Sequence, residues 1–229
     1  DPYLSRGLGD VYKRQIIANP NCSTIQMLVA LKPLHDTFCV KHINVCTYQA
    51  VSGSGKDGVE ELLQQSSAYI DQRSIDKKVY PKQIAFNSIP FVDCFLENNY
   101  TREEMKMVWE THKILDKNIS VNPTAVRVPV LVGHAESIYI ETEREIDIEL
   151  AKNCLNEFAG ISVIDDVQEV DFPTSFEHGH GTDDVYVGRI RKGLSKNNSL
   201  NLWVVADNVR KGAALNSIQI AENLVGSKM

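Results

Sequence analysis

The sequence predicts an α/β fold, because strand-like and helix-like segments alternate along a chain of 229 residues. Hydrophobic residues make up 43% and charged residues 24% of the sequence, which is ordinary for a globular protein. A chain of this length can bury one large hydrophobic core. We therefore expect one principal domain, built from the segments described next in chain order.

The first interpretable element is a helix after the turn signal at residues 19–21 (Asn-Pro-Asn). Residues with a helical period run from Thr24 to Leu31, and Pro33 is expected to limit the helix. The next segments are a strand at 41–48, a glycine- and serine-rich loop at 52–58, a helix at 59–71 and an irregular stretch at 74–93.

The strongest helix signal begins at Thr101, which is a good N-cap residue. Glu103 and Glu104 lie in the first turn, where acidic side chains suit the helix dipole, and the pattern runs to about Leu115. The later segments are predicted strands at 125–132, 137–141, 160–164, 185–190 and 200–206, and predicted helices at 145–158 and 211–224.

Composition excludes several classes of function. The formal net charge of -6, without a basic cluster, argues against a nucleic-acid partner. No apolar run approaches the ~20 residues that span a bilayer, so no membrane partner is expected. Five cysteines without a Cys-x-x-Cys pair argue against a disulfide framework or a zinc site, and His178 with His180 gives too few metal ligands. A reducing cytoplasm fits this cysteine usage best.

Cys22 is the candidate nucleophile, because it follows a tight turn and precedes a helix. A thiol at a helix N-terminus faces unpaired N–H groups and the positive end of the dipole, and both are expected to lower its pKa. The same N–H groups can hold an oxyanion. The alternative is an inert, buried cysteine, and position alone leaves both interpretations open.

Several motifs in this order resemble those of aspartate-semialdehyde dehydrogenases. The segment 17–24 (IANPNCST) resembles the nucleophile motif of that family. Further matching segments are 48–53 (YQAVSG), 84–87 (IAFN), 103–106 (EEMK), 127–130 (RVPV), 207–208 (DN) and 211–214 (KGAA). The resemblance extends from Ile16 to the end of the chain.

The resemblance implies a fold and a reaction. The fold is the catalytic domain seen in glyceraldehyde-3-phosphate dehydrogenase, with a mixed, mostly antiparallel sheet covered by helices. The reaction is the NADPH-dependent reductive dephosphorylation of L-aspartyl 4-phosphate to L-aspartate 4-semialdehyde, with release of phosphate. It proceeds through a cysteine thioester, which divides one hard displacement into two easier steps. The pathway is lysine, threonine and methionine biosynthesis.

The resemblance also assigns roles to residues, each of which has a structural alternative when taken alone. Glu103 and Lys106, for example, share a helix face and are equally well read as a surface ion pair. The implied catalytic residues are Cys22, His134 as acid/base and Gln49. The implied substrate ligands are Asn21, Glu103, Lys106 and Arg127, and the implied NADP(H) contacts are Ser52, Gly53 and Asn208.

Arg127 and His134 are separated by an odd number of residues, so a straight strand would point them to opposite faces. Pro129 and Gly133 lie between them. We therefore predict a bulge or bend in this segment, which brings both side chains to one site.

Residues 53–58 (GSGKDG) satisfy the G-x-G-x-x-G pattern of a dinucleotide-binding turn. A single match of this kind is weak evidence. The family resemblance instead implies that this loop lines the catalytic cleft, with its dinucleotide fingerprint in an N-terminal half outside this sequence. Lys56 is followed by Asp57 and not by Ser or Thr, so the loop is no P-loop.

The patterns together with the family resemblance imply three regions. Residues 1–15 read as a non-native or disordered tail, residues 16–210 as the catalytic and dimerisation domain, and residues 211–229 as a C-terminal helix that packs on the nucleotide-binding half. The resemblance implies a homodimer or tetramer. It also implies that the chain is a fragment, and that its activity in isolation is very low.

Two alternative functions stay open. The first is N-acetyl-gamma-glutamyl-phosphate reductase, which uses the same cysteine chemistry but usually carries Asn-Pro-Gly-Cys-Tyr, whereas this sequence has Asn21 and Ser23. The second, of another class, is a non-catalytic paralogue or a dimerisation module. The joint presence of Cys22, Gln49, Arg127 and His134 argues against the second.

Overall fold

The computed structural model describes residues 16–226, and the predicted tail at residues 1–15 lies outside them. The helices are α2 (Cys22–Phe38), α3 (Gly55–Ile70), α4 (Arg102–Ile114), α5 (Ile148–Asn156) and α6 (Leu215–Gly226), with shorter turns η1 (Val51–Ser54) and η2 (Arg210–Ala214). The strands are β1 (Val40–Gln49), β2 (Ser120–Arg127), β3 (His134–Thr142), β4 (Ile161–Val163), β5 (Val185–Lys192) and β6 (Ser199–Ala206).

Within residues 16–226 the strands form one six-stranded sheet in the order β2-β1-β3-β6-β5-β4. The central pairs β1–β3, β3–β6 and β5–β6 are antiparallel, and the outer pairs β1–β2 and β4–β5 are parallel. The predicted mixed, mostly antiparallel α/β sheet is therefore confirmed.

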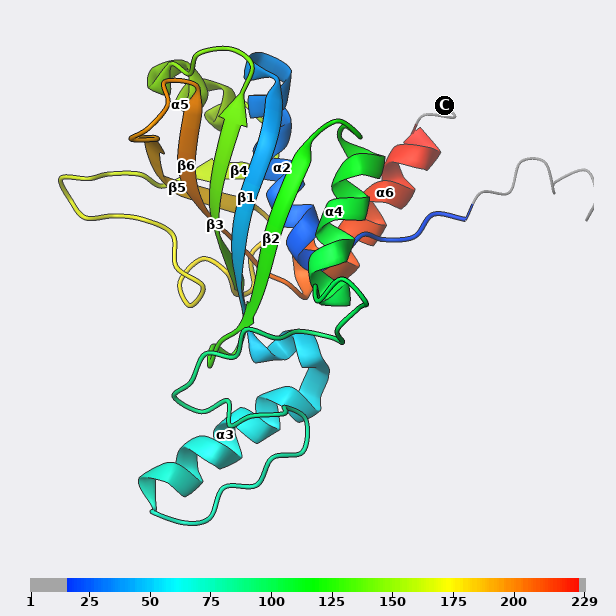
Figure 1. Cartoon of the computed structure of the whole chain (residues 1–229), viewed down its shortest axis with the longest axis vertical. Coiled ribbons are helices and arrows are strands. Elements are labelled where there is room, and N and C mark those ends of the chain that lie inside the picture. The colour runs from blue at the N-terminus through cyan, green and yellow to red at the C-terminus, as the bar shows by residue number, and fades with distance from the viewer. Residues whose placement is uncertain (1–15, 227–229) are drawn as a thin grey trace, which may run out of the picture.

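One face of the sheet carries the hydrophobic core. Figure 1 shows α2, α4 and α6 gathered on one side of the strands, while α3 stands apart below them. Apolar side chains of α2 and α5 pack on alternate positions of the strands, which point to the same face of a pleated sheet. Fully buried members include Leu31, Leu34, Ile138, Ile140 and Leu155. None of the helices described is both long and apolar enough to cross a membrane.

Two sequence expectations about helix boundaries are wrong. Pro33 was expected to limit the first helix, but α2 continues through it to Phe38, because Leu34 and Phe38 gain burial that outweighs one lost backbone hydrogen bond. The expected loop at 52–58 is instead the short turn η1 followed by the first residues of α3.

Thr101 caps α4 as predicted. Its side chain accepts from the Glu104 N–H, and the Glu104 carboxylate accepts from the Thr101 N–H, which completes a capping box. The predicted strand 125–132 is wrong at both ends, because β2 runs from Ser120 to Arg127. The predicted helix at 211–224 starts as the π-helical turn η2 before it becomes α6.

Candidate active site

Three predicted site residues meet at one edge of the sheet because of strand direction. Gln49 ends β1 and is paired in register with Arg127, which ends the parallel strand β2. β3 runs antiparallel to β1, so His134, its first residue, lies at the same edge. The edge is therefore built from residues that are far apart in the sequence.

The predicted irregularity between Arg127 and His134 is confirmed. β2 ends at Arg127, β3 begins at His134, and the connecting residues include Gly133 with a φ of 91°. That φ is in the region that favours glycine. Both flanking side chains point into the protein, with 5% and 0% of their surface exposed. A straight strand would have placed one of them outside the site.

Asn21 fixes Cys22 as the first residue of α2. The Asn21 side chain accepts hydrogen bonds from the backbone N–H groups of Ser23 and Thr24, at 3.0 Å and 3.3 Å. This is the N-cap arrangement that satisfies unpaired helix donors. The Asn21 backbone N–H donates to Glu110 at 2.9 Å, which ties the turn to α4. These contacts therefore hold Cys22 in a fixed position at the start of α2, facing the end of the sheet that carries the other site residues.

The carboxylate of Glu103 connects these elements. It accepts from the Asn21 side chain at 2.8 Å and from the Gln49 side chain at 3.1 Å. The Lys106 ammonium lies 3.2 Å from it on the same face of α4, and also 3.2 Å from Asp93. The helical ion pair foreseen from the spacing therefore exists, and it points into the site.

The predicted lowering of the Cys22 pKa is wrong for this structure. Burial, and to a smaller extent the nearby Glu103 carboxylate, raise the pKa of the Cys22 thiol to about 12. The Ser23 backbone N–H and the Arg127 guanidinium lower the pKa, but by less. The helix N-terminus thus acts as predicted, and desolvation outweighs it. Cys22 is a neutral thiol at pH 7 in this state.

Arg127 is a buried cation without an acidic partner among residues 16–226. One guanidinium nitrogen, Nη1, donates to the Ala50 carbonyl at 2.7 Å. Burial lowers the Arg127 pKa, while Glu103 and Cys22 act in the opposite direction. A buried guanidinium that has no carboxylate is costly unless an anion joins it, and its fork suits a carboxylate. Arg127 therefore marks a place for an anionic group.

His134 is neutral, and its hydrogen bonds select one tautomer. Burial and the adjacent Arg127 lower its pKa to about 3. Nδ1 accepts from the Ala50 backbone N–H at 3.1 Å. A neutral imidazole whose Nδ1 accepts carries its proton on Nε2. Nε2 is buried and has no protein partner among the described residues, so it presents an N–H donor that is free for a ligand.

The first glycine of the G-x-G-x-x-G pattern lies against the site. A Cβ at Gly53 would come within 2.8 Å of Arg127 Nη1 and 3.2 Å of His134 Cε1. Ser52 lies beside it and is hydrogen-bonded to the Asn208 side chain at 3.0 Å. Asn208 Oδ1 also accepts from the Gly133 N–H at 3.0 Å. These contacts place the predicted cofactor residues at the same edge as the candidate nucleophile.

Two residues with close contacts here were assigned no role from the sequence. A Cβ on Gly212 would lie 2.8 Å from the Cys22 Cβ, so this glycine allows η2 to pack on the nucleophile. Glu136 lies on β3 with its side chain fully buried. The signal for Glu136 was available, because it follows His134 by two residues and so shares its strand face.

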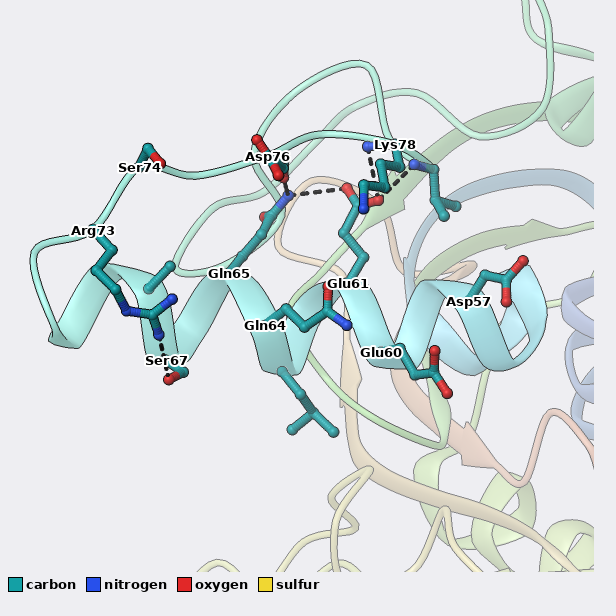
Figure 2. Close-up of a pocket in the computed structure, with 13 residues that line it drawn as sticks. Asp57, Glu60, Glu61, Gln64, Gln65, Ser67, Arg73, Ser74, Asp76 and Lys78 are labelled. Atoms are coloured by element: carbon teal, nitrogen blue, oxygen red, sulfur yellow. Dashed lines mark hydrogen bonds between the residues drawn. The ribbon is translucent and has the colours of Figure 1, made fainter.

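A separate hollow beside α3 contains none of the predicted site residues (Figure 2). Its main polar contacts hold the following loop: the Glu61 carboxylate accepts from the Lys78 and Val79 N–H groups, and Gln65 donates to the Asp76 carbonyl. These interactions have a structural purpose, and the chemistry-bearing groups lie at the sheet edge instead.

Glu103→Gln is expected to lower the Cys22 pKa. A nearby carboxylate disfavours the thiolate, so removing the charge leaves more thiolate at any pH below that pKa. We expect Cys22 to react with iodoacetamide on the order of tenfold faster at pH 8, the effect of about one pKa unit. Asp93→Asn is the matched control, because Asp93 shares Lys106 but is no cause of the Cys22 shift. Equal rates in both variants would contradict the assignment.

Comparison with known proteins gives a consistent match. The family model of the semialdehyde dehydrogenase dimerisation domain matches residues 31–211. The aspartate-semialdehyde dehydrogenase of Shewanella violacea is 57% identical over 219 residues, which cover 95% of this chain and 64% of that enzyme. The corresponding enzyme of Legionella pneumophila is 53% identical over 216 residues, with 94% and 62% covered. The chain thus spans less than two thirds of these relatives' length.

Solved structures agree with this match. Aspartate semialdehyde dehydrogenase II from Vibrio cholerae, complexed with ASA, superposes with a TM-score of 0.92 at 50% identity, over 98% of this chain and 66% of that one. Aspartate semialdehyde dehydrogenase with NADP from Candida albicans superposes with a TM-score of 0.67 at 26% identity, over 91% and 57%. The fold agreement therefore extends to distant sequences.

Proposed function

The chain belongs to the semialdehyde dehydrogenase family, and we propose that it supplies the catalytic residues of an aspartate-semialdehyde dehydrogenase. One observation carries this proposal: a buried Arg127 guanidinium, which has no acidic partner among residues 16–226, and the Glu103 carboxylate flank the Cys22 thiol. A cation and an anion placed this way complement the carboxylate and ammonium of an amino acid. The thiol then faces the acyl group of that amino acid.

The substrate is L-aspartyl 4-phosphate. Arg127 binds the α-carboxylate through two parallel hydrogen bonds, and Glu103 binds the ammonium group. Lys106 is only part-buried, so it is available at the rim for the phosphate. Asn21 and Gln49 already donate to Glu103, and they hold the substrate next to the nucleophile.

The first chemical step is an acyl transfer to sulfur. The Cys22 sulfur attacks the acyl carbon, a C–S bond forms, the C–O bond to phosphate breaks, and the thiol proton leaves with the departing group as hydrogen phosphate. The Nε2–H of His134 donates to the oxygen on which negative charge develops. NADPH, when bound, would supply the hydride that reduces the thioester to L-aspartate 4-semialdehyde, and the Cys22 sulfur would leave as a thiolate.

The residues near Gly53 fit the nicotinamide end of NADP(H). Ser52, Asn208 and the Gly133 N–H form a neutral hydrogen-bonded group next to Arg127 and His134. Amide and hydroxyl groups of this kind suit a neutral carboxamide. Gly53 has no side chain, so it leaves this surface open. In this proposal the chain contributes part of the cofactor site, and its overall reduction rate in isolation is very low.

The C-terminal helix is proposed to pack on a nucleotide-binding domain, as the family resemblance implies. On α6, Ile218 is 55% exposed and Val225 is 61% exposed, so an apolar face is available. Slower hydrogen exchange of the α6 amides in an enzyme of the relatives' full length, compared with this chain, tests this placement.

A homodimer is proposed through the sheet face opposite the helices. The family is defined by its dimerisation domain. Along β3, the outward residues Ser137, Tyr139 and Glu141 are part-buried, and Tyr48 and Trp203 form an aromatic pair at 5.4 Å on the same face. Aromatic side chains are enriched in interfaces. Sedimentation of the protein as a monomer at micromolar concentration would contradict this proposal.

The runner-up substrate is N-acetyl-glutamyl phosphate, and Glu103 argues against it. Acetylation turns the substrate's ammonium into a neutral amide, so the buried Glu103 carboxylate would gain no cation from the substrate and would keep only Lys106 as a charged partner. A non-catalytic dimerisation module is the other alternative. It does not require Cys22, Arg127 and His134 to lie at one sheet edge. Both alternatives are separated from the proposal by the experiment that follows.

Incubation of the chain with L-aspartyl 4-phosphate at pH 8 is expected to release phosphate and add one aspartyl group to Cys22. Peptide mass spectrometry after a brief reaction locates the adduct. This half-reaction needs no nucleotide, so it tests the chain directly. An adduct only with N-acetyl-glutamyl phosphate would select the runner-up. No adduct with either substrate would favour the dimerisation module.

A further inference from the structure

Glu136 is an ionisable group that the proposed reaction does not use. It is fully buried on β3, and neither carboxyl oxygen has a hydrogen-bond partner among residues 16–226. Its side chain points to the same face as that of His134, since the two residues are two positions apart on one strand. A buried polar group without a partner is costly and calls for an explanation.

No cation among residues 16–226 contributes to the pKa shift of Glu136. The residues paired with it across the neighbouring strands are Thr47 on β1 and Val204 on β6. From α2, the Gln26 side chain is the polar group that acts on Glu136. Gln26 is 1% exposed, and its Nε2 also lacks a partner among the described residues. The two side chains are therefore close, and among the described residues neither Gln26 Nε2 nor the Glu136 oxygens have another partner.

Gln26 and Glu136 lie at similar distances along their elements from the active-site residues Cys22 and His134. Gln26 follows Cys22 by four residues on one face of α2, a rise of about 6 Å. Glu136 follows His134 by two residues on β3, a rise of about 6.6 Å. Gln26 and Glu136 thus lie one step further along α2 and β3 from the ends that carry Cys22 and His134.

A protonated carboxyl group complements a primary amide. The acid offers one O–H donor and one carbonyl acceptor, whereas the carboxylate offers acceptors only. Burial raises the Glu136 pKa well above its usual range, which favours the acid form at pH 7. An ionised Glu136 would also raise the pKa of Cys22. A protonated Glu136 carries no charge, so it does not raise the pKa of Cys22 or disfavour the thiolate.

We propose that Glu136 is an uncharged carboxylic acid that pairs with Gln26. This pair fixes the position of the first turn of α2, and with it Cys22, relative to His134 on β3. Glu136 is a positioning residue, and this inference rests on the proposed role of Cys22. Its two parts, the charge state and the positioning, are each open to measurement without enzyme turnover.

Infrared difference spectra of the protein and Glu136→Gln at pH 7 test the charge state. We expect the carbonyl band of a protonated carboxylic acid in the unmodified protein and its loss in the variant. Glu61→Gln is the control, because the Glu61 oxygens accept backbone N–H groups, as a carboxylate does. The difference spectrum between the unmodified protein and Glu61→Gln should therefore show no acid band. Absence of the acid band at Glu136 overturns the proposal.

The pH profile of Cys22 alkylation gives a second readout. Glutamine replaces a neutral acid by a neutral amide of equal size, so the profile of Glu136→Gln should stay within about twofold of the unmodified protein between pH 6 and 8. Acceleration of about tenfold, equal to a drop of one pKa unit in Cys22, would mean that a carboxylate had been removed. That result overturns the proposal.

Hydrogen exchange tests the positioning. Glu136→Leu keeps the volume but cannot pair with Gln26, so the amides of residues 23–27 should exchange at least about tenfold faster, whereas Glu136→Gln should leave them unchanged. Circular dichroism confirms that both variants fold. Equal exchange in both variants overturns the positioning role. Failure of the aspartyl adduct experiment would instead remove only the proposed function.

Discussion

Cys22→Ser is expected to lower the rate of phosphate release from L-aspartyl 4-phosphate by about 10⁴- to 10⁶-fold, the range for loss of a catalytic nucleophile. The substitution changes one atom and keeps the N-cap geometry set by Asn21. A hydroxyl group ionises far less readily than a thiol, and the surroundings of Cys22 already oppose its ionisation. In the variant the serine hydroxyl would still be buried and would still lie near the Glu103 carboxylate, so both effects would continue to oppose its ionisation.

Cys46→Ser is the matched control for this prediction. Cys46 lies on β1, the strand that ends at Gln49, but its side chain points to the opposite face from Gln49 because the separation is odd. We expect its phosphate release rate to stay within about twofold of the unmodified protein, as is usual for a change away from the reacting groups. Phosphate release is followed as the initial burst, with the substrate in excess and no nucleotide present. A Cys22→Ser rate above one tenth of the unmodified rate contradicts the nucleophile assignment.

The resting pKa of Cys22 has a consequence for activation. A thiol with a pKa of about 12 contains very little thiolate at pH 7, so slow alkylation of Cys22 is expected in the free protein. In the proposed complex, a substrate ammonium beside Glu103 would add a second cation to that of Lys106 and would weaken the largest electrostatic contribution against the thiolate. Ionisation of the nucleophile is thereby favoured when an amino-acid substrate is bound.

Local patterns were enough to predict the types of most elements. The N-cap at Thr101 and the bend before His134 follow from short-range rules on caps and glycine, and both are confirmed. The α/β class and the mixed sheet are also confirmed. Pro33 is an exception, because the burial of the residues after it depends on tertiary packing that the local sequence does not reveal.

The site itself needed information of two kinds. The motifs around Cys22, Arg127 and His134 identified candidate residues. Their proximity in the fold depends on the register of β1 with β2 and β3, which the motifs do not reveal. The Cys22 pKa could not be predicted, because Glu103 comes from α4 and burial from the whole fold. Sequence alone supplied only the helix N-terminus, which is the weaker effect here.

The tautomer of His134 leads to the second large expected effect. Nδ1 is occupied by the Ala50 N–H, so Nε2 can donate a proton or a hydrogen bond but cannot accept one in the neutral ring. The acid half of the acid/base role expected from the family therefore suits the resting structure, and the base half does not. His134→Leu is expected to slow aspartyl transfer to Cys22 by about 10²- to 10³-fold, the usual effect of losing one donor to a developing oxyanion.

His134→Gln distinguishes a donor from a base. Glutamine can place an N–H group near the position of Nε2 but cannot act as a base near pH 7. If His134 donates, the glutamine variant should recover about tenfold or more of the rate lost in His134→Leu, since a neutral donor of similar reach is restored. If His134 must take the thiol proton, both variants should be equally slow. Single-turnover adduct formation at pH 8, measured side by side in the two variants, separates these mechanisms.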